Sequence, residues 1–291
     1  MIPAELRRST LSRRRRIVDL VAKVAIWLSL LVALVPLALV TWYVVAKGSQ
    51  VMGFGFLTER IPRQPRSASG GIGPAIVGTV LTTGIAALIA IPLGALGAIY
   101  LNEYGKQSPL ARTIRTMADV MTGVPSIVMG LFIYISFVLL TREQNALAGA
   151  LALACLMLPV VIRSSEEMLR LVPDELRQAS LALGARKWKT IVSVVLPAAI
   201  SGITSGALLA IARAAGETAP IVLVVGITYR PNWSLTGGNT SLPAQIFSNA
   251  SQPFQAAVDR AWGAALTLVA IVLITTLIGR YIAGRFAIRE R

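Results

Sequence analysis

The sequence predicts an all-α, polytopic membrane protein with six transmembrane helices. Its 291 residues are 55% hydrophobic, with a mean hydropathy of +0.70, which is more apolar surface than a soluble domain of this size needs. Six apolar runs divide the chain, and each reaches about the 20 residues needed to cross a hydrocarbon core. The runs are residues 17–46, 75–102, 118–140, 144–163, 196–228 and 261–284.

The distribution of positive charge predicts the orientation. Only 14% of the residues are charged, yet the net charge is +15. With the N-terminus inside, 20 of the 28 Lys and Arg residues fall in internal segments and seven in external ones, while Arg213 lies within a membrane segment. Cationic residues accumulate on the cytoplasmic side of membrane proteins. We therefore expect a prokaryotic inner or plasma membrane protein with both termini in the cytoplasm. The basic residues would then contact lipid headgroups, and no nucleic acid.

The chain divides into three parts. Residues 1–16 form a basic cytoplasmic tail, residues 17–69 the first transmembrane helix with an external loop, and residues 70–291 a core with five further helices. The first apolar run is too long for the core of a signal peptide, so we expect an anchor. The Gly-Gly-Ile-Gly-Pro run at residues 70–74 is interpreted as a loop that enters the second helix.

The residue types present exclude several kinds of chemistry. The sequence contains no histidine, which removes a Ser-His-Asp triad and any His-ligated metal site. It has no Walker-type phosphate loop, and its one cysteine, Cys155, is expected to be a packing residue. We therefore predict that the chain is not an enzyme and holds no metal or cofactor. If ATP drives transport, a separate subunit must bind ATP and Mg²⁺ and hydrolyse the ATP.

The third crossing is expected to open at Asp119, which we interpret as an interfacial cap. The sequence then runs Thr122-Gly123-Val124-Pro125-Ser126. Glycine and proline weaken a membrane helix, so backbone groups here are expected to face a cavity.

Residues 163–197 form a polar segment between apolar runs. Pro173 followed by two acids predicts a helix start, and Gly184 predicts its end, because glycine adopts the left-handed C′ conformation at no steric cost. A second, basic helix is expected over 185–195, ending at Leu196-Pro197. This segment has the character of a docking surface on the cytoplasmic side.

The most informative charges are Arg213 and Glu217, which are followed by Thr218. Residues four apart share a helix face and can pair. A charge within the bilayer costs at least ~2.5–3.5 kcal/mol, so it needs a partner or water. Two interpretations remain open: the pair pins helices together, or it lines the path of an anion. The cost of burying these charges favours the path, because a guanidinium can hold oxyanions while a carboxylate accepts a hydroxyl proton.

The polar segment resembles the EAA loop of ABC-transporter permeases. The resemblance rests on the spacing of Gln178-Ala179-Ser180, Gly184-Ala185 and Leu196-Pro197. In that family the loop is the coupling helix that docks on the ATP-hydrolysing subunit. Gln178 stands where the family has glutamate, and Ser180 where it has a second alanine. We call residues 163–197 the coupling loop.

Three other motifs resemble permeases of phosphate importers, in the same order along the chain. They are the Gly-Gly-Ile-Gly-Pro run, residues 123–128 (Gly-Val-Pro-Ser-Ile-Val) and residues 213–219 (Arg-Ala-Ala-Gly-Glu-Thr-Ala). The similarity covers about residues 70–285, so it implies that 70–291 is a permease core with the type I ABC importer permease fold. It also implies phosphate import by alternating access, with Arg213, Glu217 and Thr218 in the substrate pathway. The implied partners are a second homologous permease subunit, two copies of an ABC ATPase and an external phosphate-binding protein.

Two kinds of alternative remain. A permease of the same fold could carry another oxyanion, such as molybdate or sulfate. A membrane scaffold or membrane-embedded enzyme is a different class. The absence of a nucleophile constellation weighs against the enzyme, and the specific spacing of the coupling loop weighs against the scaffold.

Overall fold

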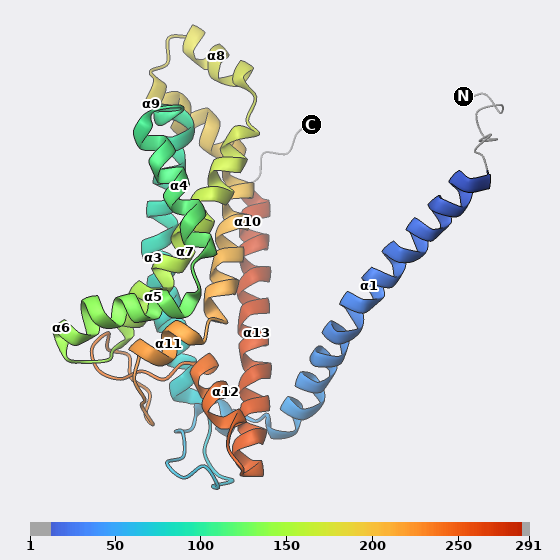
Figure 1. The fold of residues 1–291 in the computed structure, drawn as a ribbon. Helices are drawn as coiled ribbons and strands as arrows, with labels where there is room; N and C mark the ends of the chain where they lie inside the picture. Colours follow the sequence, from blue (N-terminus) through green and yellow to red (C-terminus); the bar gives the residue numbers. More distant parts are fainter. Residues whose placement is uncertain (1–12, 287–291) are drawn as a thin grey trace.

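The computed structural model describes residues 13–286, and every regular element among them is helical (Figure 1). Five helical segments are long and apolar enough to cross a membrane. They are Ile17–Val51, Gly73–Gly105, Ala146–Arg170, Lys187–Ala215 and Gln255–Ile282. The helices Pro109–Gly123 and Ser126–Thr141 pass the same test as a pair and are bent by 106° where they meet. The number of crossings equals the predicted six when this bent pair is counted as one broken span.

The long spans are built on α1 (Arg13–Gly48), α3 (Gly73–Ile99), α7 (Ala146–Arg170), α10 (Leu196–Ala215) and α13 (Gln255–Phe286). Residues 13–16 belong to α1, while residues 1–12 of the predicted tail lie outside the described part of the chain. The segment that follows α1 carries α2 (Phe54–Thr58) and the segment before α13 carries α12 (Leu242–Ala250), and the sequence indicated neither of these short helices.

The third crossing differs from its predicted course. Its first helix, α4 (Pro109–Gly123), begins ten residues before Asp119, and Ser108 caps it by accepting a hydrogen bond from the Ala111 amide. Asp119 is therefore inside the helix, and its interpretation as a cap is wrong. The chain turns at Val124, whose extended backbone is the conformation that a following proline imposes. It continues as α5 (Ser126–Ile133), a π-helical turn (Tyr134–Val138) and α6 (Leu139–Thr141).

The predicted crossing over 196–228 is wrong at both ends. The helix expected to stop at Leu196-Pro197 continues from α9 (Lys187–Thr190) through a π-helical segment (Ile191–Val195) into α10. A wider turn directly before Pro197 accommodates a residue that lacks an amide donor. At the other end α10 stops at Ala215, and a separate short helix, α11 (Ala219–Val224), follows.

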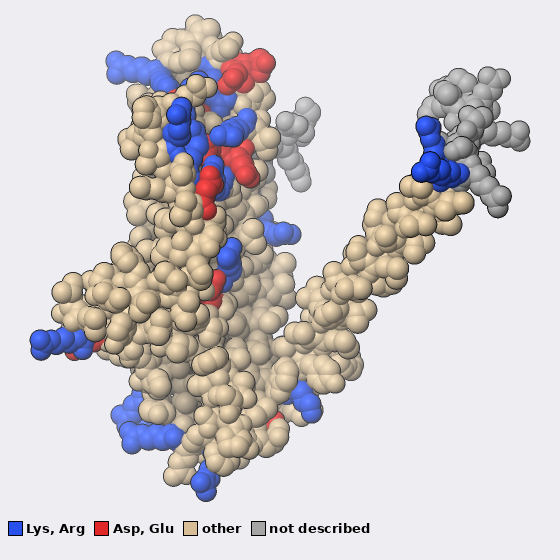
Figure 2. Space-filling view, in the orientation of Figure 1, with Lys and Arg blue, Asp and Glu red and all other residues tan. Residues whose placement is uncertain are grey.

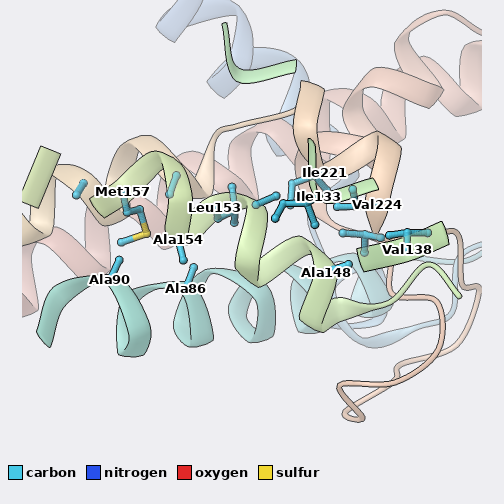
Figure 3. Close-up of a cluster of buried hydrophobic side chains, with 14 of the residues drawn as sticks. Ala86, Ala90, Ile133, Val138, Ala148, Leu153, Ala154, Met157, Ile221 and Val224 are labelled. Atoms are coloured by element: carbon cyan, nitrogen blue, oxygen red, sulfur yellow. The ribbon is translucent and has the colours of Figure 1, made fainter. Parts of the chain in front are cut away.

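Helices α3 and α7 pack against each other in the centre of the bundle. Small side chains allow this close approach, with Ala86 and Ala90 on α3 facing Ala154 and Met157 on α7 (Figure 3). The same apolar cluster takes in residues from α5 and α11, so the two short helices beside the breaks are anchored to the core.

Helix α1 diverges from the rest of the bundle (Figure 1). It approaches α13 closely near Gly48, where an added Cβ would lie 2.7 Å from the Leu266 Cβ. The starting end of α1 and the final end of α13 point toward the end of the molecule that carries α8 (Asp174–Ala182). Acidic and basic side chains gather at that same end (Figure 2).

Gly78 and Gly84 on α3 offer a matched test of the packing. A Cβ on Gly78 would lie 2.0 Å from the Thr240 carbonyl oxygen, whereas one on Gly84 would meet nothing within 4 Å. Overpacking costs ~1–3 kcal/mol, so Gly78→Ala should lower the melting temperature of the purified protein while Gly84→Ala leaves it unchanged. Equal melting temperatures for the two variants would contradict the close approach of α3 to the Thr240 loop.

Candidate functional site

A cavity of about 180 Å³ lies where two helix breaks meet. One break is the turn between α4 and α5, and the other is the C-terminal end of α10. The lining residues are Met121, Thr122, Val124, Pro125, Ser126, Leu156, Met157, Val160, Ala210, Arg213, Ala214 and Glu217. Since interrupted membrane helices free backbone groups that need polar surroundings, the two breaks explain why a polar cavity forms inside an apolar bundle.

The end of α10 is set by local sequence. The amides of Gly216 and Glu217 donate to the carbonyls of Arg213 and Ala214, at 3.1 and 3.2 Å, and so tighten the last turn. Pro220 then lies in the first turn of α11, a position where its missing amide donor costs nothing. The chain therefore changes direction while Arg213 and Glu217 stay on one side of the break.

The structure brings Arg213 and Glu217 together across this break. The Arg213 Nε lies 3.7 Å from the Glu217 Oε1, which is an ion pair but is too long for a hydrogen bond. The Arg213 side chain is 67% exposed and that of Glu217 only 19%. The guanidinium therefore keeps donors free for another partner. Thr218 lies at the start of α11 and is not among the residues that line the cavity.

Two hydroxyl groups extend the polar wall. Ser126 begins α5, and Thr122 lies in the last turn of α4 with its hydroxyl donating to the Asp119 carbonyl at 2.7 Å. No side chain caps the start of α5, where the Val128 amide donates to the Pro125 carbonyl at 2.9 Å. The helix dipole favours negative charge at such a position. Sequence reasoning expected a cavity beside this motif but did not select Thr122 or Ser126 as site residues; the Val-Pro-Ser break was the available signal.

The coupling loop is the second feature of interest. Helix α8 has Asp174 and Glu175 in its first turn, as predicted, and no buried residue. Gly184 has φ +81°. Its amide donates to the Leu181 carbonyl, and the amide of Ala185 donates to the Ser180 carbonyl. These two hydrogen bonds form a Schellman motif, so the predicted glycine stop is confirmed.

The surface of this loop is unusually apolar for an exposed helical turn. Leu176, Leu181, Leu183 and Trp188 are exposed, and Leu183 reaches 89%. Exposed apolar clusters mark contact sites for other proteins more often than solvated faces.

The predicted coupling residues divide into two groups. Gln178, Ala179 and Gly184 are exposed, while Ser180 and Ala185 are partly buried. The Ser180 hydroxyl lies 2.9 Å from that of Thr190, which ties α8 to α9. Leu196 and Pro197 are partly buried at the base of α10, where Leu196 packs against an apolar cluster that contains Val195 and Ala199.

The sequence did not reveal that the coupling loop and the broken crossing both bond to buried carboxylates. Arg177 of α8 pairs with Glu103, and Arg115 of α4 pairs with Glu166, at 2.8 and 2.7 Å. The two carboxylates are 7% and 2% exposed. Their arginines were counted only as orientation signals, because charge counting does not show which acid each arginine meets. Within residues 13–286, no group of three or more acidic or cysteine side chains could hold a metal ion.

A helical bundle with six crossings, two helix breaks around a charged cavity and one exposed helical loop defines a membrane permease of the type I ABC importer fold. Residues 90–288 match the family described as "Binding-protein-dependent transport system inner membrane component". The chain belongs to this family.

Two relatives align with almost the whole length of this chain. The chain is 46% identical to "Phosphate transport system permease protein PstA 1" of Mycobacterium tuberculosis (strain CDC 1551 / Oshkosh), an alignment that covers 94% of this chain and 92% of that protein. It is 40% identical to "Phosphate transport system permease protein PstA" of Yersinia pestis, over 90% of each.

Solved structures show the same fold at low identity. A chain of a bacterial alginate ABC transporter, in complex with its alginate-pentasaccharide-bound periplasmic protein, has a TM-score of 0.63 at 15% identity and covers 94% of this chain and 97% of that one. A chain of the inward-facing MetNI methionine ABC transporter has a TM-score of 0.58 at 19% identity, over 74% of this chain and 94% of that one.

Cysteine labelling in the membrane tests the cavity. With the sole native cysteine removed by Cys155→Ser, a thiol introduced as Ser126→Cys should react with a charged, water-soluble reagent about tenfold faster than one introduced as Ala152→Cys, because only exposed thiolates react. Ala152, on α7, is fully buried and serves as the control. Equal rates at the two positions would show that water does not enter the cavity.

Proposed function

We propose that this chain is the transmembrane permease subunit of an ATP-driven ABC importer that carries inorganic phosphate across a bacterial membrane by alternating access. The observation that supports this most strongly is 46% identity over 94% of the chain to a phosphate permease, together with the open arginine in the cavity. Phosphate uptake in cells that lack this chain is the direct test.

The cavity suits an anion that carries both negative oxygens and a hydroxyl group. Arg213 has free donors, and the Ser126 hydroxyl adds a further donor to the lining of the same cavity. Glu217 can accept a proton from a protonated oxyanion, which a bare guanidinium site would not do. Thr218, adjacent to this wall, remains a proposed pathway residue.

The exposed guanidinium also argues for a second permease subunit. A charge inside a membrane needs a partner or water, and Arg213 is mostly uncovered in this chain alone. We propose that a homologous permease subunit covers this side as a heterodimer and that the substrate pathway runs between the two subunits. Helix α1, which leaves its own bundle, presents an apolar surface to lipid or to this partner.

The coupling loop is the proposed contact with two copies of an ABC ATPase, one for each permease subunit. Exposed Leu183 and Trp188 would provide apolar contact, and the Schellman turn at Gly184 would hold them in place. The ATPase would bind ATP and Mg²⁺, with no cofactor on this chain. In this orientation α8 and both termini face the cytoplasm, and an external phosphate-binding protein delivers the anion to the opposite side.

A permease of the same fold for another oxyanion, such as molybdate or sulfate, is the alternative. The relatives named above are phosphate permeases, which favours phosphate. A membrane scaffold without transport activity would not need an uncovered arginine beside two helix breaks.

Arg213→Ala should abolish high-affinity uptake of labelled phosphate in cells that lack the native chain, while the complex still assembles. Losing a hydrogen bond to a charged group costs ~1.5–3 kcal/mol, which corresponds to roughly 10- to 100-fold in rate. Glu217→Gln should impair uptake less, since the anion is held mainly by the guanidinium. Arg230→Ala, an exposed arginine of the following loop, serves as the control.

Uptake that remains normal after complete loss of the chain would remove the phosphate assignment. Failure of the Arg213→Ala complex to assemble would instead assign the ion pair a structural role.

Gly184→Pro should release the ATPase from the purified permease. Proline fixes φ near −65°, whereas Gly184 has φ +81°, so the turn that presents Leu183 would be lost. Gly184→Asn is the matched control, because asparagine tolerates the left-handed conformation at a helix end. Co-purification of the ATPase measures the contact, and undiminished recovery with Gly184→Pro would contradict docking through this loop.

A further inference from the structure

Two buried carboxylates, Glu103 and Glu166, connect α8 and the broken third crossing to the rest of the bundle. We propose that these residues are the mechanical link that carries a displacement of α8 to the cavity. The inference rests on the proposed function, because it requires that an ATPase moves the coupling loop. It assigns positioning roles to seven charged side chains that do not line the cavity: Glu103, Glu166, Arg177, Lys187, Arg115, Arg163 and Asp119.

The first step of the link joins α8 to the end of α3. Arg177 donates from Nε and NH2 to the Glu103 Oε1, at 3.2 and 2.8 Å. The same guanidinium also donates to the carbonyls of Leu169 and Val172 at the end of α7. Because α8 has no buried residue, this 15%-exposed arginine ties it to the bundle, together with the hydrogen bond between Ser180 and Thr190.

A second contact reinforces this step. The Lys187 ammonium of α9 lies 4.6 Å from the centre of the Tyr104 ring, next to Glu103 in the π-helical turn Tyr100–Gly105. Two basic residues on opposite sides of the Gly184 turn therefore hold the same short segment. A displacement of the loop would act on this segment first.

The next step joins that segment to α4. Arg115 donates to the carbonyls of Leu101 and Lys106, at 2.8 and 2.6 Å, and also to the Glu166 Oε1. Helix α4 buries only Ala111 and Ala118. Its position therefore depends on these bonds more than on apolar packing.

The last step reaches the cavity. Arg163 of α7 forms an ion pair with Asp119 of α4 and donates to the Arg115 carbonyl at 3.3 Å. Asp119 lies two residues before Met121, the first cavity-lining residue of α4, and its carbonyl accepts the hydroxyl of Thr122. A shift of α4 therefore moves the wall of the cavity directly.

The arrangement differs from one that only stabilises the fold. The buried carboxylates lie on α7 and in the π-helical turn that continues α3, whereas α8 and α4, which bury few residues, supply the long arginines. Directional, charge-assisted bonds therefore join α8 and α4 to the central pair of helices.

The test uses the complete complex in proteoliposomes and measures ATP hydrolysed per phosphate transported. Glu103→Gln should raise this ratio by about tenfold, as expected for uncoupling of linked sites, while the yield of assembled complex stays within about twofold. Arg177→Gln should give the same result, and the double variant should be no worse, because the two side chains act as a unit. Glu143→Gln removes an exposed acid from the turn between α6 and α7, outside the coupling loop, and should leave the ratio unchanged.

A ratio equal to wild type in the assembled Glu103→Gln complex would overturn the link, because transport and hydrolysis would then still be coupled. If Glu103→Gln does not assemble, Arg177→Lys decides, since it keeps the charge but loses the two-pronged bond. A raised ratio then supports the link, and a wild-type ratio overturns it. Absence of phosphate transport by the wild-type complex would refute the proposed function instead.

Discussion

The architecture depends on the cost of leaving backbone groups unpaired inside a membrane. A continuous helix satisfies its own amides and carbonyls, so a break is tolerated only where it faces protein or a polar cavity. This chain breaks two of its crossings, at Val124-Pro125 and at residues 216–218, and both breaks line one cavity. Polar groups of the chain therefore gather around one cavity, because polar surroundings are needed where the helices break. These groups are the Arg213–Glu217 pair, the hydroxyls of Thr122 and Ser126, and the start of α5.

The helices of the bundle differ in how many apolar side chains they bury, so some are held firmly and others weakly. Helices α3 and α7 pack together through small side chains (Figure 3). In contrast, α8 is held by Arg177 and by the hydrogen bond between Ser180 and Thr190, and α4 buries two alanines and forms ion pairs. Charges accordingly gather at the α8 end of the molecule (Figure 2). Under the proposed function, this division would allow an ATPase to displace α8 and α4 while α3 and α7 stay packed.

The sequence predicted the class of protein from motif spacing, the apolar crossings from hydropathy, and the turn at Gly184 from the need for a left-handed residue at a helix end. All three are local properties of the chain. It misplaced the limits of two crossings, because the polar α4 has no apolar signal and because Pro197 sits inside a continuing helix. The sequence predicted that Arg213 and Glu217 pair, but it placed both residues in one continuous helix and missed the break between them. The bonds to Glu103 and Glu166 join residues 74 and 51 positions apart, which no local pattern encodes.

In the proposed function, the anion crosses the membrane past Arg213. A structure of the complete importer trapped with phosphate is the most direct test of this route. Density for the anion is expected within hydrogen-bonding distance of that guanidinium, between the two permease subunits. Density on another route, with Arg213 turned away from it and covered by a neighbouring protein carboxylate, would show that the anion does not pass this residue.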